Sequence, residues 1–355
     1  MAKIMIGGAG GAPSEGVIRS LQINNKNDEI IGMGSEPTDL VLSAADKKYF
    51  IPYADTSGYR DSLLSILEIE KPDLLHFQND LEIYQASLIR EDILSAGTKL
   101  FMPDHAVIDT CVHKFKSYAA FKSAGVPVPI NIMINNEDEL KHAFDVLGDA
   151  DGKIWLRASS IGGGGKGAIP TNDFALAKAW IDHYDGWGDF CAAEMLMPET
   201  VTWLSIWYEG ELVVAQARDR KGWTHGNRSI SGVTGVTKVG VTSSRSDVSE
   251  TAMAAVKAVS TKPHGIFGVD MAYDKTGRPC PTEINISRFF TTVLFFTKAG
   301  LNMPGIFRDL ALDGQSASFH NKIGMLPDGL HWVRGMDTEP RLMTAKRITD
   351  EIHFL

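Results

Sequence analysis

A glycine-rich stretch in the middle of the chain combines unshielded backbone with two positive charges. The stretch WLRASSIGGGGKGAIP runs from Trp155 to Pro170 and begins with an apolar run that contains Arg157. Glycine lets backbone N–H groups approach phosphate oxygens without obstruction by side chains. Lys166 adds a mobile charge and Arg157 a fixed one. The stretch therefore predicts either a lid that closes over a nucleotide or a plain surface hairpin.

The two best-known phosphate-binding loops do not fit this chain. A Walker A loop requires Ser or Thr directly after its lysine, but Gly167 follows Lys166. The dinucleotide fingerprint requires GxGxxG after the first strand. Gly8 and Gly10 begin such a pattern, but Pro13 stands in place of the third glycine.

A second stretch, GVDMAYDKTGRPCPTEINISR, brings oxygen ligands together on a predicted hairpin. Asp270 and Glu283 are expected to face each other, and strand alternation places Asn285 on the same face as Glu283. Carboxylate and amide oxygens suit a magnesium ion that carries phosphates. The alternative, solvated charges on an edge hairpin, describes Asp274 and Lys275 better than Glu283 and Asn285, which lie in an apolar strand.

A third stretch, ARDRKGWTHGNRSISGVTG, is rich in cations and glycine. It predicts a flexible segment beside an anionic centre, with a solvated loop as the alternative. Arg218 is the preferred phosphate or carboxylate contact, whereas a lone loop histidine such as His225 is a weaker candidate for a proton acceptor. The polar candidates of this stretch are Arg218, Arg220, Lys221, His225 and Arg228.

The first part of the chain predicts an α/β unit, which is one of the elements that must position these residues. Residues 1–105 alternate short apolar runs with helical patterns, which predicts an open parallel sheet. Residues 109–125 predict one amphipathic helix, with Asp109 as its N-cap and Gly125 at its end.

The rest of the chain predicts strands and helices in mixed order. The stretches 202–219 and 266–285 predict hairpins that turn at Glu209–Gly210 and Asp274–Gly277. The sequence favours core positions over a pocket lining for three tryptophans, Trp203, Trp207 and Trp223. Further strands are expected at 131–134, 153–158 and 190–196, and further helices at 135–148, 172–184, 249–262 and 303–314.

Composition limits the class of protein. The 355 residues carry a net charge of −9, which argues against a nucleic-acid partner. The cysteines Cys111, Cys191 and Cys280 are far apart in sequence and predict reduced thiols. We find neither a secretion signal nor an apolar run of about 20 residues, so the expectation is a cytoplasmic protein with no membrane partner.

In this order, the motifs resemble those of ATP-grasp enzymes, most closely the carbamoyl-phosphate-synthetase and biotin-carboxylase branch. The similarity covers roughly residues 3–312. LRASSIGGGGKGA resembles the glycine-rich lid, DMAYDKTGRPCPTEIN the metal hairpin, and HKFKSYAAFKSAGVPVP the helix with the first ATP lysine. The resemblance implies an α/β chain: a preATP-grasp open parallel sheet followed by two α+β subdomains that clasp ATP. The implied units are 1–105 (preATP-grasp), 106–190 (lid subdomain), 191–325 (subdomain with the metal hairpin) and 326–355 (tail).

The resemblance also implies roles for individual residues. It implies catalytic roles for Arg288, Arg218 and Lys166. It implies Asp270, Glu283 and Asn285 as ligands of two Mg²⁺ ions, with Mn²⁺ as the alternative metal. The implied ATP contacts, of which Glu194 to Leu196 form the hinge strand at the adenine, are Lys114, Arg157, Gly162, Gly163, Gly164, Gly165, Lys166, Gly167, Glu194, Met195 and Leu196.

Two positions depart from the family pattern. Val201 stands where many relatives have the ribose-binding glutamate, with Glu199 the nearest acid. Ser287 stands where many relatives have an arginine, which here comes one residue later as Arg288.

The implied activity is that of an ATP-dependent, ADP-forming carboxylate–amine ligase that acts through an acyl phosphate. Its partners would be a small carboxylate and an amine, and a homodimer is common in such relatives. Two alternatives stay open: a carbamoyl-phosphate-synthetase-like enzyme acting on bicarbonate or carbamate, and an ATP-binding regulator without activity. The chain shows one ATP-grasp half and neither a glutaminase segment nor a biotin carrier.

Overall fold

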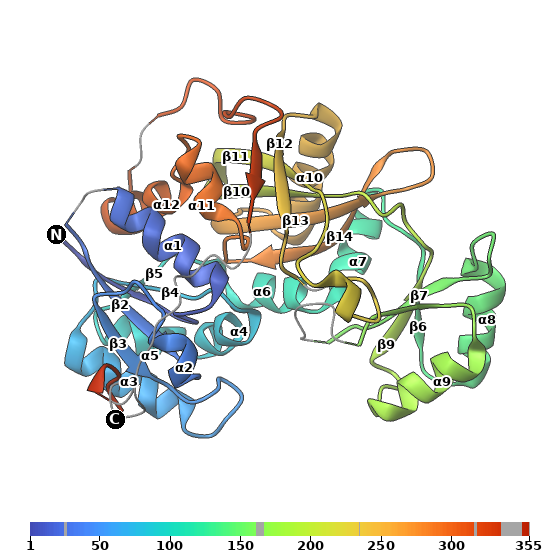
Figure 1. The fold of residues 1–355 in the computed structure, drawn as a ribbon, viewed down its shortest axis with the longest axis horizontal. Coiled ribbons are helices and arrows are strands. Elements are labelled where there is room, and N and C mark those ends of the chain that lie inside the picture. The colour runs from blue at the N-terminus through green and yellow to red at the C-terminus, as the bar shows by residue number, and fades with distance from the viewer. Residues whose placement is uncertain (25–26, 161–166, 234, 316–317, 335–349, 355) are drawn as a thin grey trace.

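The computed structural model describes residues 1–24, 27–160, 167–233, 235–315, 318–334 and 350–354. Within them, the strands form three sheets: a parallel one, a four-stranded antiparallel one and a six-stranded antiparallel one (Figure 1). The mixed α/β fold class agrees with the expectation from sequence.

The first sheet is parallel, in the order β3-β2-β1-β4-β5. Its strands are short and mostly buried, as the alternation of apolar runs with helices predicts. The sequence reading missed β3, a strand of only four residues that includes two lysines. The elements are β1 (Lys3–Ile6), α1 (Ala12–Ile23), β2 (Glu29–Gly34), α2 (Pro37–Leu40), β3 (Lys47–Phe50), α3 (Tyr59–Glu70), β4 (Leu74–His76), α4 (Asp80–Leu88), α5 (Arg90–Ser95) and β5 (Lys99–Leu100).

The predicted helix over 109–125 is wrong in one respect: the chain forms two helices there. α6 (His105–Val112) and α7 (Lys114–Ser123) are separated by His113, whose φ and ψ of −95° and 103° are extended. Asp109 therefore lies inside α6 and is no N-cap. Its carboxylate accepts a hydrogen bond from Lys116 at 2.6 Å. Gly125, with φ +72°, follows α7 as predicted.

The four-stranded sheet has the order β6-β9-β7-β8 and its own apolar core. Its two helices begin at side-chain caps, Asn136 and Asp173. In Figure 1 these helices lie on the side of the sheet turned away from the rest of the molecule. The elements are β6 (Asn131–Ile134), α8 (Glu137–Leu147), β7 (Ile154–Ala158), β8 (Ile169–Thr171), α9 (Phe174–His183) and β9 (Phe190–Ala193).

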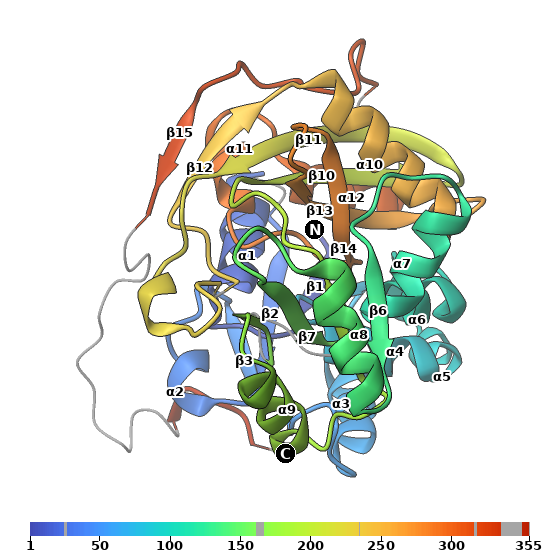
Figure 2. The same ribbon diagram turned by 90° about the vertical axis from the view of Figure 1, so that its right-hand side faces the viewer.

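The six-stranded sheet has the order β14-β13-β10-β11-β12-β15. Trp203 and Trp207 are buried in its core, as expected. Figure 2 shows β15 beside β12 at the outer edge of this sheet. The elements are β10 (Thr200–Tyr208), β11 (Glu211–Arg220), the 3₁₀ turn η1 (Gly226–Arg228), β12 (Val239–Ser243), α10 (Ser246–Val259), β13 (Gly265–Tyr273), β14 (Pro279–Ile286), α11 (Val293–Lys298), α12 (Met303–Asp313) and β15 (His331–Val333).

Two apolar clusters join the parallel sheet to the six-stranded sheet. One contains Met5 together with Trp203, and the other contains Ile4 together with Leu204. The C-terminal residues also return to the parallel sheet. There, the His353 carbonyl accepts from the Phe50 amide at 2.9 Å, and the His353 ring stacks on Tyr49.

The predicted division into four units stays a prediction, and two of its boundaries cut across sheets. The boundary after residue 190 falls within β9, which pairs with β6 and β7. The predicted tail from residue 326 includes β15, a strand of the six-stranded sheet. Cys111, Cys191 and Cys280 are buried free thiols, as expected. Among the described residues, no helix is long and apolar enough to cross a bilayer.

Candidate active site

The predicted hairpin forms, and its register places the two carboxylates opposite each other. Asp270 on β13 pairs with Glu283 on β14, and the register shifts just beyond this pair. Asn285 donates its side-chain amide to Asp270 Oδ2 at 3.1 Å. The three oxygen-bearing side chains therefore lie together on two neighbouring strands.

Asp270 is kept ionised by its neighbours. Burial alone would raise the pKa of this carboxyl group, but the charge of Arg220 and a hydrogen bond from the Thr202 hydroxyl lower it below the ordinary value. The Arg220 guanidinium lies 3.5 Å from Asp270 Oδ1. Arg220 is itself held between this carboxylate and the ring of Trp223, whose centroid is 3.9 Å away. Of the three tryptophans, Trp223 is thus the one beside the site.

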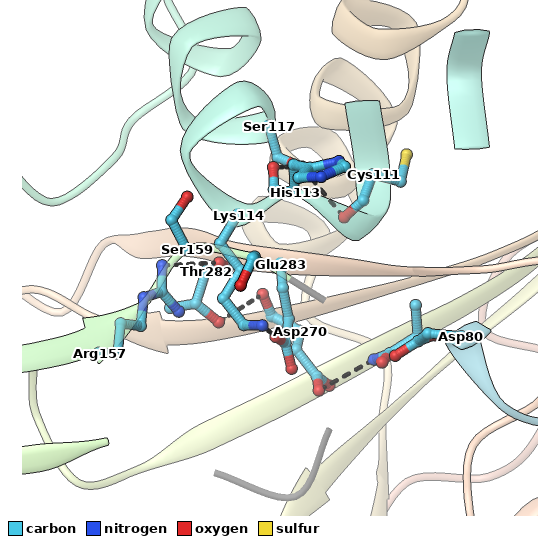
Figure 3. A network of polar contacts seen from close by, with 12 residues as sticks. Asp80, Cys111, His113, Lys114, Ser117, Arg157, Ser159, Asp270, Thr282 and Glu283 are labelled. Carbon is cyan, nitrogen blue, oxygen red and sulfur yellow. Dashed lines mark hydrogen bonds and ion pairs between the residues drawn. The ribbon is translucent and has the colours of Figure 1, made fainter. Parts of the chain in front are cut away.

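Two cations from other elements approach the same hairpin. Lys114 Nζ, at the first residue of α7, lies 4.0 Å from Glu283 Oε2. Arg157 on β7 donates from Nη2 to the carbonyl of Thr282 at 3.3 Å. Its Nε is buried and has no acceptor among the described residues. Figure 3 shows Lys114 and Arg157 reaching the hairpin from one side and Asp80 from the other.

The break at His113 explains how Lys114 reaches the hairpin. Because α7 starts afresh at Lys114, the first amides of the helix need acceptors. Ser159, just after β7, supplies them: its carbonyl accepts from the Lys114 amide at 3.0 Å and its Oγ accepts from the Phe115 amide at 3.2 Å. The start of the glycine-rich stretch therefore fixes the helix that carries Lys114.

The glycine-rich stretch joins β7 to β8, two antiparallel neighbours. Gly162, Gly163, Gly164, Gly165 and Lys166 lie outside the described residues. Both flanks are anchored: Ser160 donates its amide and its hydroxyl to Asp189, and Trp180 donates its indole N–H to the Gly167 carbonyl at 3.1 Å. Gly167 has φ +73°, which favours glycine.

Arg288 lies next to the hairpin and is oriented by an acid that sequence reasoning missed. Its Nε donates to Asp80 Oδ1 at 2.6 Å, its Nη2 donates to Asp80 Oδ2 at 3.1 Å, and Nη2 also donates to Asn285 Oδ1. Burial alone would lower the pKa of Arg288, but the Asp80 carboxylate raises it overall. Ser287 turns the chain toward this pair with φ +55°. The sequence signal for Asp80 is its place just after the buried strand β4.

Arg218, expected as a phosphate or carboxylate contact, lies in a strand and not on a flexible segment. It lies within β11, is completely buried, and donates to the hydroxyls of Thr202, Thr237 and Thr292. Burial, followed by the nearby charge of Arg220, lowers the pKa of its guanidinium to about 9. Its charge helps to lower the pKa of Asp270, and the two side chains share Thr202 as a hydrogen-bond partner. His225 lies on the exposed segment beyond β11.

The residues expected to read adenine lie just beyond a strand, because β9 ends at Ala193. Glu194 Oε1 accepts from the Ile130 amide at 3.1 Å, and the Met197 amide donates to the Tyr273 carbonyl at 2.8 Å. Between them, the amides of Met195 and Leu196 have no acceptor within the described chain. Val201 is fully buried in β10.

The side chains of Asp270, Glu283 and Asn285 suit a divalent metal ion that also binds phosphates. Two carboxylates and one amide leave coordination positions for phosphate oxygens and water, as Mg²⁺ requires. Among the described residues, no group of three or more His, Cys, Asp or Glu side chains could hold a metal, and this donor set has two carboxylates and an amide. The unpartnered Arg157 Nε beside this donor set is suited to an anionic oxygen.

Three solved structures are similar to this chain along most of its length. Biotin carboxylase from Campylobacter jejuni has a TM-score of 0.70 at 17% identity, covering 91% of this chain and 73% of that one. Carboxyaminoimidazole ribonucleotide synthase from Aspergillus clavatus, complexed with ATP, has a TM-score of 0.66 at 16% identity, covering 88% of this chain and 77% of that one. L-amino acid ligase from Bacillus licheniformis has a TM-score of 0.65 at 11% identity, covering 88% of this chain and 74% of that one.

Neither a family model nor a curated protein matches the sequence. The likeness to these structures is therefore one of fold. It agrees with the order of motifs along the chain, from the parallel sheet through the glycine-rich stretch to the carboxylate hairpin. The chain has the ATP-grasp fold.

Proposed function

We propose that this chain is an ATP-dependent, ADP-forming carboxylate–amine ligase. The observation that carries the proposal is the meeting of Lys114, Arg157 and the Asp270–Glu283 pair, which come from four separate elements. Cations beside two facing carboxylates suit a triphosphate with divalent metal. The similar structures include enzymes whose names state a complex with ATP, which supports the same assignment.

The reaction would proceed in two steps. A substrate carboxylate oxygen attacks the γ-phosphorus of ATP, which forms an acyl phosphate and releases ADP. The nitrogen of an amine then attacks the acyl carbon, so that the C–O bond to phosphate breaks, an amide forms, and phosphate leaves together with a proton. An acyl phosphate is destroyed by water, so this chemistry requires a closed site.

Different residues of this chain would have different roles in the reaction. Lys114 and Arg157 would bind the phosphate oxygens, and Arg288, held by Asp80, would stabilise the negative charge that develops on the reacting groups. Met195 and Leu196 would offer their amides to the adenine edge. Arg218 would act at a distance by keeping Asp270 charged. Residues 162–167 would close over the phosphates, as their composition predicts.

Asp270, Glu283 and Asn285 would hold Mg²⁺, two ions being the expectation and Mn²⁺ the alternative. When bound, the metal neutralises phosphate charge and aligns the reacting groups. Asn285 currently accepts from Arg288 through the oxygen that would face the metal. We expect this hydrogen bond to be exchanged when metal and nucleotide bind. Cytoplasmic location and a homodimer stay predictions.

The test is Glu283→Gln, which keeps the size of the side chain and removes its charge. We expect ADP formation with pooled acids and amines to fall by at least about 10²-fold, while circular dichroism and the melting temperature stay unchanged. Glu250→Gln, an exposed charge on α10, is the matched control. Wild-type turnover in Glu283→Gln would refute the metal assignment. ATP binding without turnover in the wild type would favour a regulator.

A further inference from the structure

A short segment of the parallel-sheet unit faces the loop that carries Arg288. The segment is 76–80, from the end of β4 to the start of α4, and the loop is 287–289, directly after β14. In a strand, side chains two residues apart point to the same side. The segment keeps this alternation, because the loop is contacted by every second side chain: His76, Gln78 and Asp80.

Gln78 holds the backbone of this loop, whereas Asp80 holds the side chain of Arg288. The side-chain oxygen of Gln78 accepts from the Phe289 amide at 2.8 Å. Phe289 is fully buried, and Gln78 is only 4% exposed. A buried backbone N–H needs an acceptor, and the ladder of β14 has already ended at Ile286. The acceptor therefore comes from a side chain 211 positions away in the sequence.

The orientation of the Gln78 side-chain amide follows from its partners. A backbone N–H only donates, so the atom that faces Phe289 N is the oxygen. A carbonyl only accepts, so the atom 3.1 Å from the Pro13 carbonyl is the nitrogen. His76 Nε2 lies 3.2 Å from the Gln78 oxygen and therefore carries a proton. Burial lowers the pKa of His76 to about 4, which agrees with a neutral ring.

Arg288 lies between two backbone positions that are held from different sheets. Before it, the Ser287 amide donates to the Ile266 carbonyl of β13 at 2.8 Å. After it, the Phe289 amide donates to Gln78. Ser287 has φ +55°, a left-handed conformation that is unfavourable for a residue other than glycine. Such a turn persists only where the surrounding contacts hold it, and the bond to Gln78 is one of these contacts.

The position of this turn decides where the guanidinium of Arg288 lies. Asp80 accepts from Arg288 at two points, 2.6 and 3.1 Å away. A two-point contact is directional, so a shift of the backbone at Phe289 would weaken it without any change at Asp80. Arg288 also donates to Asn285 on the carboxylate hairpin. A displaced turn would therefore move a positive charge relative to the hairpin.

We propose that Gln78 is a positioning residue for Arg288 and acts through the backbone of Phe289. Its three hydrogen-bond partners, Phe289, His76 and Pro13, are uncharged, so its effect on the site passes through the turn. The importance of Arg288 for turnover rests on the proposed function. The positioning itself can be measured on the full chain without nucleotide.

The test is Gln78→Met, which keeps the length of the side chain and removes the acceptor. We expect the Arg288 Nε–H to exchange with solvent at least about tenfold faster, as measured by ¹⁵N NMR. The kcat for ADP formation should fall about tenfold or more. The KM for ATP should stay within about twofold, because Lys114 and Arg157 are not touched. If Gln78→Met does not fold, Gln78→Asn, which shortens the side chain by one methylene, has the same expected results.

Gln216→Met is the matched control. Gln216 is fully buried in β11 and also accepts from a backbone amide, that of Leu326 at 2.9 Å. Its replacement should lower the melting temperature but leave exchange at Arg288 unchanged. Gln78→Glu is the rescue, because it keeps an oxygen for the Phe289 amide. We expect exchange and kcat within about threefold of wild type, although loss of the donor to Pro13 lowers the melting temperature.

Three results would overturn the proposal: wild-type exchange at Arg288 in Gln78→Met, equal acceleration in Gln216→Met, or no rescue by Gln78→Glu. Turnover separates this proposal from the proposed function. If exchange accelerates as expected but no acid and amine raise ADP formation by the wild type, the ligase assignment fails and the positioning role stands. If the wild type turns over and Gln78→Met leaves kcat unchanged, the ligase assignment stands and the positioning role fails.

Discussion

Asp270 is a partly buried carboxylate that depends on its neighbours for its charge. Arg220 faces it at 3.5 Å, the Thr202 hydroxyl donates to it, and Arg218 lies behind Thr202. In the proposed reaction only the ionised form of Asp270 is a metal ligand. The pKa of this one group should therefore set the acid side of the pH–activity profile.

Arg220→Gln tests this dependence. Removing the positive charge raises the pKa of Asp270, so we expect the acid limb of kcat/KM against pH to move to higher pH. Arg220→Lys keeps a charge and should leave the limb near its wild-type position. An unmoved limb in Arg220→Gln would show that Asp270 does not control activity.

Glu82 offers a test of stability against pH. Burial raises its pKa from 4.5 to about 7, so the folded chain keeps a proton that the unfolded chain releases above pH 4.5. The contribution of Glu82 to stability is therefore greatest below pH 4.5, declines as pH rises toward 7, and is constant above that. The full decline is about 3 kcal/mol.

We expect Glu82→Gln to remove this decline. Between pH 5 and pH 8, the free energy of unfolding of the variant should rise relative to that of the wild type. Urea unfolding at each pH measures this difference. Other titrating groups cancel in the comparison. Parallel curves for the two proteins would contradict a raised pKa for a buried acid at this position.

At the scale of elements, the break between α6 and α7 positions Lys114. The residues from Asp109 to Ser123 are all compatible with a continuous helix, which is why the sequence predicted one over 109–125. The break depends on Ser159, which is 45 positions beyond Lys114 and supplies acceptors to the new helix start. Such a tertiary cap has no local sequence signal.

Ser159→Ala should therefore weaken both the helix and the site. Loss of the Oγ acceptor should cost about 1 kcal/mol of stability and raise the KM for ATP, because Lys114 would be held less firmly. Ser160→Ala, which removes a hydrogen bond to Asp189 but none to α7, is the neighbouring control. Equal effects of the two substitutions on the KM would argue against the cap.

The carboxylate hairpin was predictable for the opposite reason. Its turn residues, its alternation and the spacing from Asp270 to Glu283 all lie within one short stretch. Asp80 was not predictable, because its partner Arg288 lies 208 positions away along the chain. β3 was missed because four residues with two lysines give little apolar signal.

At the scale of the whole molecule, the parallel-sheet unit is part of the candidate site. Apolar clusters join it to the six-stranded sheet, and the Asp80–Arg288 pair adds a polar link beside the hairpin. By contrast, the four-stranded sheet that carries Arg157 has a separate core. The nucleotide would therefore be held between a fixed body and a sheet with fewer apolar ties to it.

Asp80→Asn measures what the polar link contributes. The guanidinium of Arg288 would lose its charged partner, so we expect turnover to fall by about 10–100-fold, the usual cost of removing a residue that orients a functional group. Asp92→Asn, which breaks the exposed pair with Arg60, is the control and should leave turnover unchanged. Full activity in Asp80→Asn would show that Arg288 needs no orientation from the parallel-sheet unit.

The return of the C-terminal residues to β3 has a practical consequence. Residues around His353 cover the outer edge of the parallel sheet, and Ile352 is buried there. Uncovered strand edges recruit other chains. Affinity tags and fluorescent fusions therefore belong at Met1, which is 96% exposed. A fusion next to His353 would disturb the residues that cover the edge of the sheet and would favour aggregation.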